Sequence, residues 1–334
     1  MTFRSIGELA ATIVNRLEEN VTSKPYRISE PGIFANMSIR DYFADPCPTP
    51  SLTQSIAKIL IDKSPRHAWA AHPRLNPEWE ADEPTKFIMG NAAHWHLIGR
   101  GKDVVVVEQD SWRSNAAKEA REKALAAGKI AVLREQFDRA GDMAEAALDQ
   151  LSDLGLIDDW NPKNGAGEVV LAWREPGGFW YRTMIDWLPK HCGVIYDYKT
   201  TEASASPQKL PSKMADDGWC IQAAMHERGL NVLDLNNVGR RKHRFVCQEC
   251  EYPYALTVTE ITEAPMTIGR KMLAYADERW RICLDAGTHR EAWPGYGVDI
   301  QRPEMPSWAE TRWLNREIEH EERRRAAPAL MPPV

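Results

Sequence analysis

Apolar residues along the chain recur either at helical spacing or in the short runs typical of buried strands. Helical spacing predicts helices over residues 6–19, 54–63, 86–99, 114–127, 134–154, 214–228, 264–286 and 308–325. Short apolar runs predict strands over residues 104–107, 168–175, 180–188, 193–199 and 244–261, the last broken at Pro253. The order of these elements is helices first, then strands, a helix, two more strands and a helix. This order predicts an α/β fold with a mixed central sheet flanked by helices.

The stretch from Trp180 to Thr200 is predicted to lie near the centre of this sheet as two strands joined by a turn. Side chains alternate faces along a strand, so Asp197 and Lys199 share one face, and Asp186 on the preceding strand can reach the same patch. Carboxylates and a lysine are costly to bury unless they pair or hold a cation. Carboxylate oxygens suit Mg²⁺ or Mn²⁺. The alternative is a surface hairpin whose charges face water, and a lone Asp-x-Lys favours that alternative.

Composition adds few constraints. The net charge is −6, and no run of eighteen apolar residues exists, so no transmembrane helix is expected. The first twenty residues lack the apolar core of a signal peptide, and a cytoplasmic protein is expected by default. The six cysteines are scattered through apolar runs, as reduced core thiols are. Mild acidity does not exclude nucleic acid, because a local basic groove can hold it, and residues 240–244 form a dense basic run.

Other polar residues each have a structural as well as a functional interpretation. Cys247 and Cys250 have the spacing of a zinc pair, but residues three apart on a strand face opposite ways, so one ion could not bind both. His94 and His96 point in different directions on their helix, so at most one serves a given site. His94 is alternatively a core histidine, Glu168 a surface acid, Gln222 an ordinary polar position and the run at 240–244 a solvated loop.

The ordered set of these residues resembles a known nuclease superfamily. The chain resembles the PD-(D/E)xK nucleases of the RecB and lambda-exonuclease type in the order of four features. These are a Gly-x-x-x-His helix at Gly90 and His94, then Asp186, then Asp197-Tyr198-Lys199, and finally a helix with Gln222. The flanking segments resemble the RecE-like exodeoxyribonuclease VIII family of prophages: GIFANMSIRDYF, PSLTQSIAKILIDKSP, GNAAHWHLI, SNAAKEAREKALAAGKIAVL, RTMIDWLP, VIYDYKTTEASA, FVCQECEYPYAL and RICLDAGTHREAWPGY.

The resemblance implies a PD-(D/E)xK core with helical N-terminal additions. We expect an N-terminal helical extension over residues 1–30, the exonuclease domain over 31–308, and a charged C-terminal helix and tail over 309–334, disordered from residue 326. Implied metal ligands for Mg²⁺, with Mn²⁺ as a substitute, are His94, Glu168, Asp186, Asp197 and the Tyr198 carbonyl. Implied catalytic residues are Glu168, Asp186, Asp197, Lys199 and Gln222.

The expected DNA contacts come from two places in the sequence. Arg240, Arg241, Lys242 and Arg244 would bind phosphates in a salt-sensitive, sequence-blind manner. The family commonly places a tyrosine four residues after the helix glutamine, whereas this chain has His226 there. An imidazole can still hydrogen-bond a phosphate, although its charge depends on pH.

By resemblance, the chain is expected to be a Mg²⁺-dependent DNA exonuclease acting on double-stranded ends. It would digest in the 5′ to 3′ direction and leave 3′ tails for a single-strand annealing protein in recombination. Lambda-type relatives form rings, so a homo-oligomer is an open expectation, and no membrane partner is expected. Three alternatives stay open: a single-strand or endonucleolytic enzyme with the same site, a non-catalytic DNA-end-binding protein, and a structural zinc protein using Cys247 and Cys250.

Overall fold

The computed structural model describes residues 26–80 and 88–326 of the chain. It divides into two units, one ending at Gly295 and the other starting at Tyr296. The first contains the strands, and the second contains helix α11 (Ser307–Ala326). The domain boundary predicted at residue 308 therefore falls inside the second unit. The helix predicted over residues 6–19 and most of the tail predicted over 326–334 lie outside the described residues.

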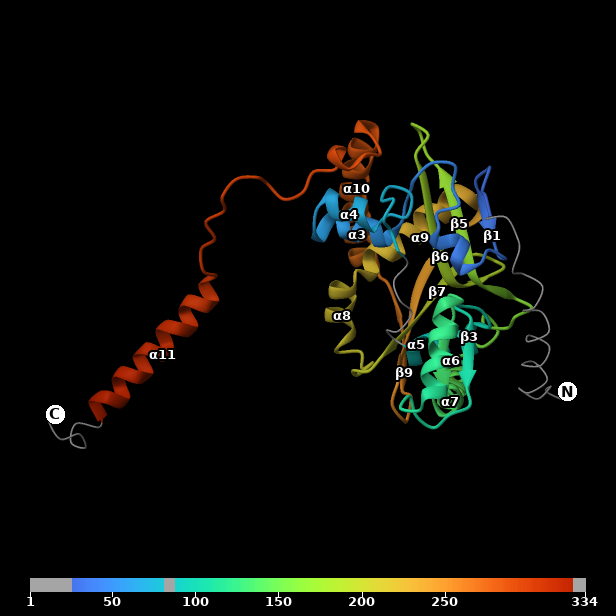
Figure 1. Ribbon diagram of the computed structural model, residues 1–334, viewed down its shortest axis with the longest axis horizontal. Helices are drawn as coiled ribbons and strands as arrows, with labels where there is room; N and C mark the ends of the chain where they lie inside the picture. Colours follow the sequence, from blue (N-terminus) through green and yellow to red (C-terminus); the bar gives the residue numbers. More distant parts are fainter. Residues whose placement is uncertain (1–25, 81–87, 327–334) are drawn as a thin grey trace. The chain divides into compact units, whose positions relative to one another are not determined.

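A seven-stranded mixed sheet forms the centre of the first unit (Figure 1). Its strands are β1 (Gly32–Phe34), β2 (Ser51–Leu52), β5 (Gly165–Arg174), β6 (Trp180–Pro189), β7 (Val194–Thr201), β8 (Lys242–Glu249) and β9 (Leu256–Glu260). The order is β1-β5-β6-β7-β8-β9, with β2 paired to β6. The pairs β7–β8 and β2–β6 are parallel and the others antiparallel, which confirms the predicted mixed sheet with the Asp-x-Lys strand, β7, near its centre.

Helices cover both faces of the sheet. One core is built with α3 (Gln54–Asp62), α4 (Pro65–Ala71), α8 (Leu210–Asp217), α9 (Trp219–Leu233) and α10 (Glu263–Ala286), and the other with α5 (Ile88–Ile98) and α7 (Arg134–Asp153). Alternation along β7 separates the two cores, because Ile195 packs into the first and Tyr196 into the second. Across the described ranges, none of these helices combines the length and hydropathy needed to cross a bilayer.

A small parallel unit follows α5. Strands β3 (Val104–Val107) and β4 (Ile130–Leu133) pair in parallel, and α6 (Asn115–Ala126) crosses between them and shares their core. The sequence predicted only a Gly128-Lys129 break between two helices, and it missed β4. The run Ile130–Leu133 is fully buried, so it carries no polar alternation that would distinguish a strand from a helix end. Short elements complete the chain: α2 (Ile39–Phe43) and the 3₁₀ turns η1 (Leu235–Asn237) and η2 (Arg290–Ala292).

The single helix predicted over residues 214–228 is two helices in the structure, α8 and α9, and two glycines explain the difference. The chain breaks at Gly218, whose φ of 76° favours glycine, and α9 then continues through Gly229. Gly229 is a packing position instead of a terminator, because a Cβ there would lie 2.7 Å from the ring of Trp173. The break at Gly218 sets where α9 begins, and with it the position of Gln222, which contacts Lys199 of β7.

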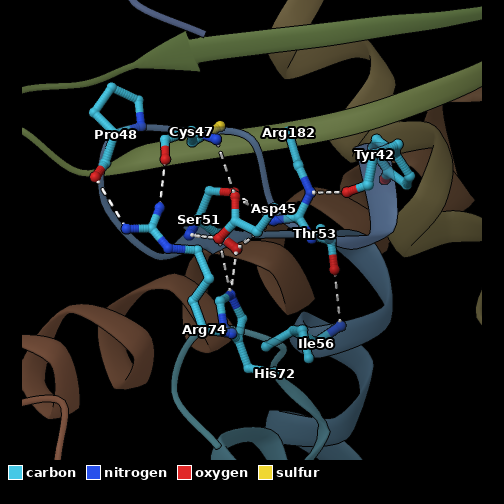
Figure 2. A network of polar contacts seen from close by, with 10 residues as sticks. All are labelled: Tyr42, Asp45, Cys47, Pro48, Ser51, Thr53, Ile56, His72, Arg74 and Arg182. Atoms are coloured by element: carbon cyan, nitrogen blue, oxygen red, sulfur yellow. Dashed lines mark hydrogen bonds and ion pairs between the residues drawn. The ribbon is translucent and has the colours of Figure 1, made fainter. Parts of the chain in front are cut away.

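A buried polar network fixes the loop before β2 to strand β6 (Figure 2). Asp45 is fully buried and forms ion pairs with Arg182 of β6 at 3.0 Å and with His72 at 3.3 Å. Its carboxylate also accepts hydrogen bonds from the backbone N–H and the hydroxyl of Ser51 at 2.9 and 2.7 Å. Burial would raise the pKa of Asp45, but Arg182 and His72 hold it well below its usual range. The network thus anchors β2 and the start of α3 next to a site strand.

Candidate active site

Strands β6 and β7 are joined by a single pair, Trp187 with Tyr196. Asp186 directly precedes this pair on β6, and Asp197 directly follows it on β7. The carboxylate of Asp186 accepts a hydrogen bond from the backbone N–H of Tyr198 at 2.9 Å. The structure therefore brings Asp186 to the Asp-x-Lys strand, as the sequence predicted.

Asp197, Lys199 and Gln222 form a closed polar ring. The Lys199 ammonium pairs with Oδ1 of Asp197 and donates to Oε1 of Gln222 at 3.0 Å. The amide nitrogen of Gln222 donates to Oδ2 of Asp197. Asp197 is fully buried, whereas Lys199 remains 26% exposed. Gln222 reaches this ring from the first turn of α9, which begins just after Gly218.

Glu168 and His94 complete the cluster from β5 and α5. The pairs Gly167–Trp187 and Val169–Ile185 flank Glu168 and set it opposite Asp186 in the register. Nε2 of His94 lies 3.6 Å from Oδ1 of Asp186, and its Nδ1 lies 3.8 Å from Oε1 of Glu168. Glu168 itself has a φ of 50°, an uncommon backbone conformation for a residue inside a strand.

The buried charges perturb one another. Burial raises the pKa of Glu168 to about 6, against the opposing charge of His94. Burial also raises the pKa of Asp197, and the negative charge of Asp186 adds to this effect. For Asp186 the burial effect is outweighed by His94, Lys199 and the Tyr198 N–H, so its pKa is lowered. For His94, burial opposes protonation, but the two facing carboxylates raise the pKa.

This donor set fits a hard divalent cation. Octahedral Mg²⁺ keeps its ligands about 2.1 Å away, which sets neighbouring ligand atoms about 3 Å apart. The 3.6 Å between His94 Nε2 and Asp186 Oδ1 is slightly longer than this and too long for a direct hydrogen bond. A cation would also offset the repulsion between Asp186 and Asp197. Among residues 26–80 and 88–326, no group of three acidic, histidine or cysteine side chains is arranged to hold a metal ion as it stands. Asp197 is bonded to Lys199 and Gln222, so it would have to release one of these partners to bind the ion.

His96 points away from the cluster, as its spacing predicted. Its Nε2 lies 3.1 Å from the carbonyl oxygen of Phe137, and the two rings contact at 4.3 Å between centroids. Burial lowers the pKa of His96, which keeps it neutral in this contact. His96 is therefore a packing residue between α5 and α7.

The basic run at residues 240–244 does not reach the carboxylates. Strand β8 begins with Lys242 beside Val194, and Arg244 lies beside Tyr196 and donates to its hydroxyl, on the face of the sheet opposite Asp197. Arg241 is buried and pairs with Asp234 at 2.6 Å. Arg244 and Lys242 pair with Glu260 at 2.9 and 3.5 Å, and Arg240 donates to the carbonyl of Asn236 at 2.8 Å. The predicted phosphate contacts of this run are therefore separate from the carboxylate cluster, and within the run the Arg241 side chain is turned into the protein.

His226 also differs from its prediction. It is fully buried, and its Nδ1 lies 3.0 Å from Nε2 of His243, which is buried as well. Burial lowers the pKa of His226 to about 3, so the ring is neutral. His226 therefore packs α9 onto β8 and offers no exposed nitrogen to a phosphate. Sequence spacing gave no sign of this, because the partner, His243, comes from the basic run.

Cys247 and Cys250 face opposite cores, as predicted. Cys247 packs with the α9 and α10 core and Cys250 with the α5 and α7 core.

Gly101 is a neighbour of the site that no sequence pattern had predicted. A Cβ on Gly101 would lie 3.3 Å from Nδ1 of His94 and 3.7 Å from Oε1 of Glu168. Two glycines around an arginine, Gly-Arg-Gly-Lys at residues 99–102, were the available signal.

The family model of the PDDEXK-like domain of unknown function (DUF3799) matches residues 55–297, which include every residue of the cluster. A crystal structure of a candidate exonuclease from Eubacterium rectale aligns with a TM-score of 0.48 and 12% identity, over 77% of this chain and 91% of that one. The structure of SSO0001 aligns with a TM-score of 0.26 and 13% identity, over 60% and 91%. No curated protein matches the sequence.

Proposed function

The chain belongs to the family of PDDEXK-like domains, and from this premise we propose that it is a metal-dependent nuclease that hydrolyses phosphodiester bonds in DNA. The observation that carries the proposal is the convergence of three carboxylates, an imidazole and a lysine. They come from α5, β5, β6 and β7 and meet where β6 and β7 join. Buried charges so arranged are costly without a cation to hold, so a purely structural role explains them poorly.

Asp186, Asp197 and His94 would hold a divalent ion, together with the Tyr198 carbonyl and Glu168. Such an ion supplies positive charge to phosphate oxygens and lowers the pKa of a bound water. Mg²⁺ is the proposed ion because most donors are oxygens, and Mn²⁺ would substitute because it accepts the imidazole readily.

Lys199 would act as a fixed cation and hydrogen-bond donor. Burial opposes its protonation, but the Asp197 and Asp186 carboxylates raise its pKa, so the ammonium form persists at neutral pH. A protonated amine cannot accept a proton from water, so Lys199 would orient the attacking water and offset charge on the phosphate. Gln222 fixes the position of Lys199 through its Oε1 and of Asp197 through its amide.

The finer proposal concerns the substrate and rests on the resemblance to RecE-like enzymes. We infer action on double-stranded ends in the 5′ to 3′ direction, in the cytoplasm, giving 3′ tails for an annealing protein. A ring-shaped homo-oligomer enclosing DNA belongs to the same proposal. The site residues do not depend on these points, because a single-strand or endonucleolytic enzyme would use the same cluster.

Digestion of three DNA substrates with Mg²⁺ tests this proposal. Linear duplex labelled at one 5′ or one 3′ end is compared with closed circular DNA and with a single strand. A 5′ to 3′ exonuclease releases the 5′ label at once, retains the 3′ label, and leaves the circle intact. Nicking of the circle would show an endonuclease instead. Binding of ends without any cleavage would show a non-catalytic end-binding protein.

A further inference from the structure

A short glycine-rich loop lies over one corner of the candidate site. Residues 99–102 read Gly-Arg-Gly-Lys and follow α5, which carries His94. Gly99 has a φ of 72° and Gly101 a φ of 145°, both of which glycine adopts without strain. A side chain at Gly101 would crowd His94 and Glu168, since its Cβ would lie 3.3 Å from Nδ1 of His94. The loop backbone therefore lies directly against the His94 and Glu168 corner.

Arg100 stands between these two glycines and is half-buried. Its guanidinium donates one long hydrogen bond, at 3.4 Å, to the carbonyl oxygen of Met37. Within residues 26–80 and 88–326 it forms no ion pair with an acid, although it lies close enough to Glu168 to act on that carboxylate. Most of its five N–H donors are thus uncommitted beside a cluster of carboxylates.

Several other arginines of the first unit are committed to acids. Arg182, Arg228 and Arg281, for example, each pair with Asp or Glu at 3.0 Å or less. The other cation of the site, Lys199, is engaged by Asp197 and Gln222. The cations of the basic run at residues 240–244 are engaged by acids or a backbone carbonyl. Among the described residues, Arg100 is therefore a guanidinium beside the site without an acidic ion-pair partner, and a guanidinium fork matches two phosphate oxygens.

We propose that Arg100 forms a phosphate-binding subsite for DNA, presented by the loop of residues 99–102 next to His94 and Glu168. The inference rests on the proposed function and specifies where the backbone of the substrate enters the site. The phosphate is either an internal phosphodiester or a terminal 5′-phosphate, because the guanidinium recognises the same oxygens in both.

A structural role for Arg100 makes different predictions. If the residue only screens Glu168 and bonds Met37, its replacement lowers stability but leaves DNA affinity and its salt dependence unchanged in folded protein. A phosphate contact instead contributes to counterion release. Removing one contact lowers the slope of log affinity against log salt by about one, for any sequence.

The test measures binding of a fluorescent linear duplex with Ca²⁺ in place of Mg²⁺, at several salt concentrations. Arg100→Gln is the main variant, because glutamine removes the positive charge while keeping a polar side chain of similar stem. Arg100→Lys keeps the charge without the fork. Arg113→Ala is the control, since Arg113 is an exposed arginine of the same segment. We expect Arg100→Gln to weaken binding about tenfold or more and to lower the salt slope by about one. We expect Arg100→Lys to be intermediate and Arg113→Ala to match the wild type.

Wild-type affinity and slope in folded Arg100→Gln would overturn the subsite, and so would an equal loss in Arg113→Ala. Repeating the titration with 5′-phosphate and 5′-hydroxyl duplexes separates the two phosphate sources, because only a terminal subsite distinguishes them. Cleavage by the wild type with Mg²⁺ is measured alongside. Failure of the wild type to bind or cleave DNA would overturn the proposed function and the subsite together. Cleavage with unchanged Arg100→Gln binding would overturn the subsite alone.

Discussion

The imidazole Nε2 of His94 lies 3.6 Å from Oδ1 of Asp186, and this contact joins helix α5 to the centre of the sheet. If His94 is a metal ligand, His94→Ala should lose activity most severely with Mg²⁺, because the affinity of the site for Mg²⁺ is already marginal. Activity should recover partly at high Mn²⁺, because the remaining carboxylates suffice for that ion. Activity measured against the concentration of each metal checks this expectation.

His96→Ala is the matched control on the same helix. His96 bonds and stacks on Phe137, so its replacement should lower the melting temperature by a few degrees. Its metal curves should equal those of the wild type. If the metal curves of His94→Ala also equal those of the wild type, His94 is a core residue, and Glu168 becomes the additional ligand.

Lys199 and Gln222 should differ in the size of their effects. Lys199→Ala removes the cation at the site and should reduce kcat about a thousandfold or more, whereas Gln222→Leu removes only its positioning partner and should reduce kcat about 10- to 100-fold. KM should change little in Gln222→Leu, because the amide has no predicted contact with DNA. Steady-state kinetics on linear duplex checks both. Equal activity of folded Lys199→Ala and wild type would show that the lysine has no catalytic role.

The strongest patterns in the sequence predicted the strands and site residues that the structure brings together. Aromatic and β-branched residues predicted β6 and β7, and two-residue spacing predicted the shared face of Asp197 and Lys199. The sequence offers Ser51 or Thr53 as the cap of α3, and in the structure it is the Thr53 hydroxyl that accepts from the Ile56 N–H, at 3.3 Å. These features are local, so one stretch of sequence contains all of their determinants.

The wrong predictions depend on partners distant in the sequence. The sequence predicts that the helix ends at residue 228, before Gly229, but the role of this glycine is set by its packing on Trp173 of β5. It predicts a DNA contact at His226, but His243 and the sheet bury this residue. Arg241 belonged to a basic run in the sequence, yet it turns inward to Asp234. Charge and helix spacing cannot show which side of an element the rest of the fold will cover.

Cys247→Ser and Cys250→Ser should keep activity and bind no less metal than the wild type. The two thiols pack into the cores on opposite faces of the sheet, Cys247 from β8 and Cys250 from just after its end, so they cannot share one ion. Each serine buries a hydroxyl, and a loss of roughly 1–3 kcal/mol of stability is expected. Elemental analysis of the purified proteins checks the metal content. Stoichiometric zinc in the wild type that is lost in either variant would contradict the strand geometry.

The buried histidine pair should make stability fall as the solution is acidified. Burial lowers the pKa of His226 to about 3 and that of His243 well below its usual value. The unfolded chain therefore binds more protons below about pH 6.5, and each imidazole removes up to about 1.4 kcal/mol of stability per pH unit below that point. Urea unfolding near pH 7 and near pH 5 should show a smaller pH effect in His226→Phe than in the wild type. An unchanged pH effect in the variant would show that this pair does not titrate on unfolding.

The central claim is that the cluster around Asp186 and Asp197 hydrolyses DNA with a divalent metal. The direct measurement is nucleotide release from linear duplex by wild type and by Asp197→Asn, each with Mg²⁺ and with excess EDTA. Asn fits the same space and can still accept from Gln222, so the variant should fold. The account predicts release by the wild type with Mg²⁺ only, and a rate at least about a thousandfold lower in folded Asp197→Asn. Hydrolysis that persists in EDTA, or equal rates in the two proteins, would contradict it.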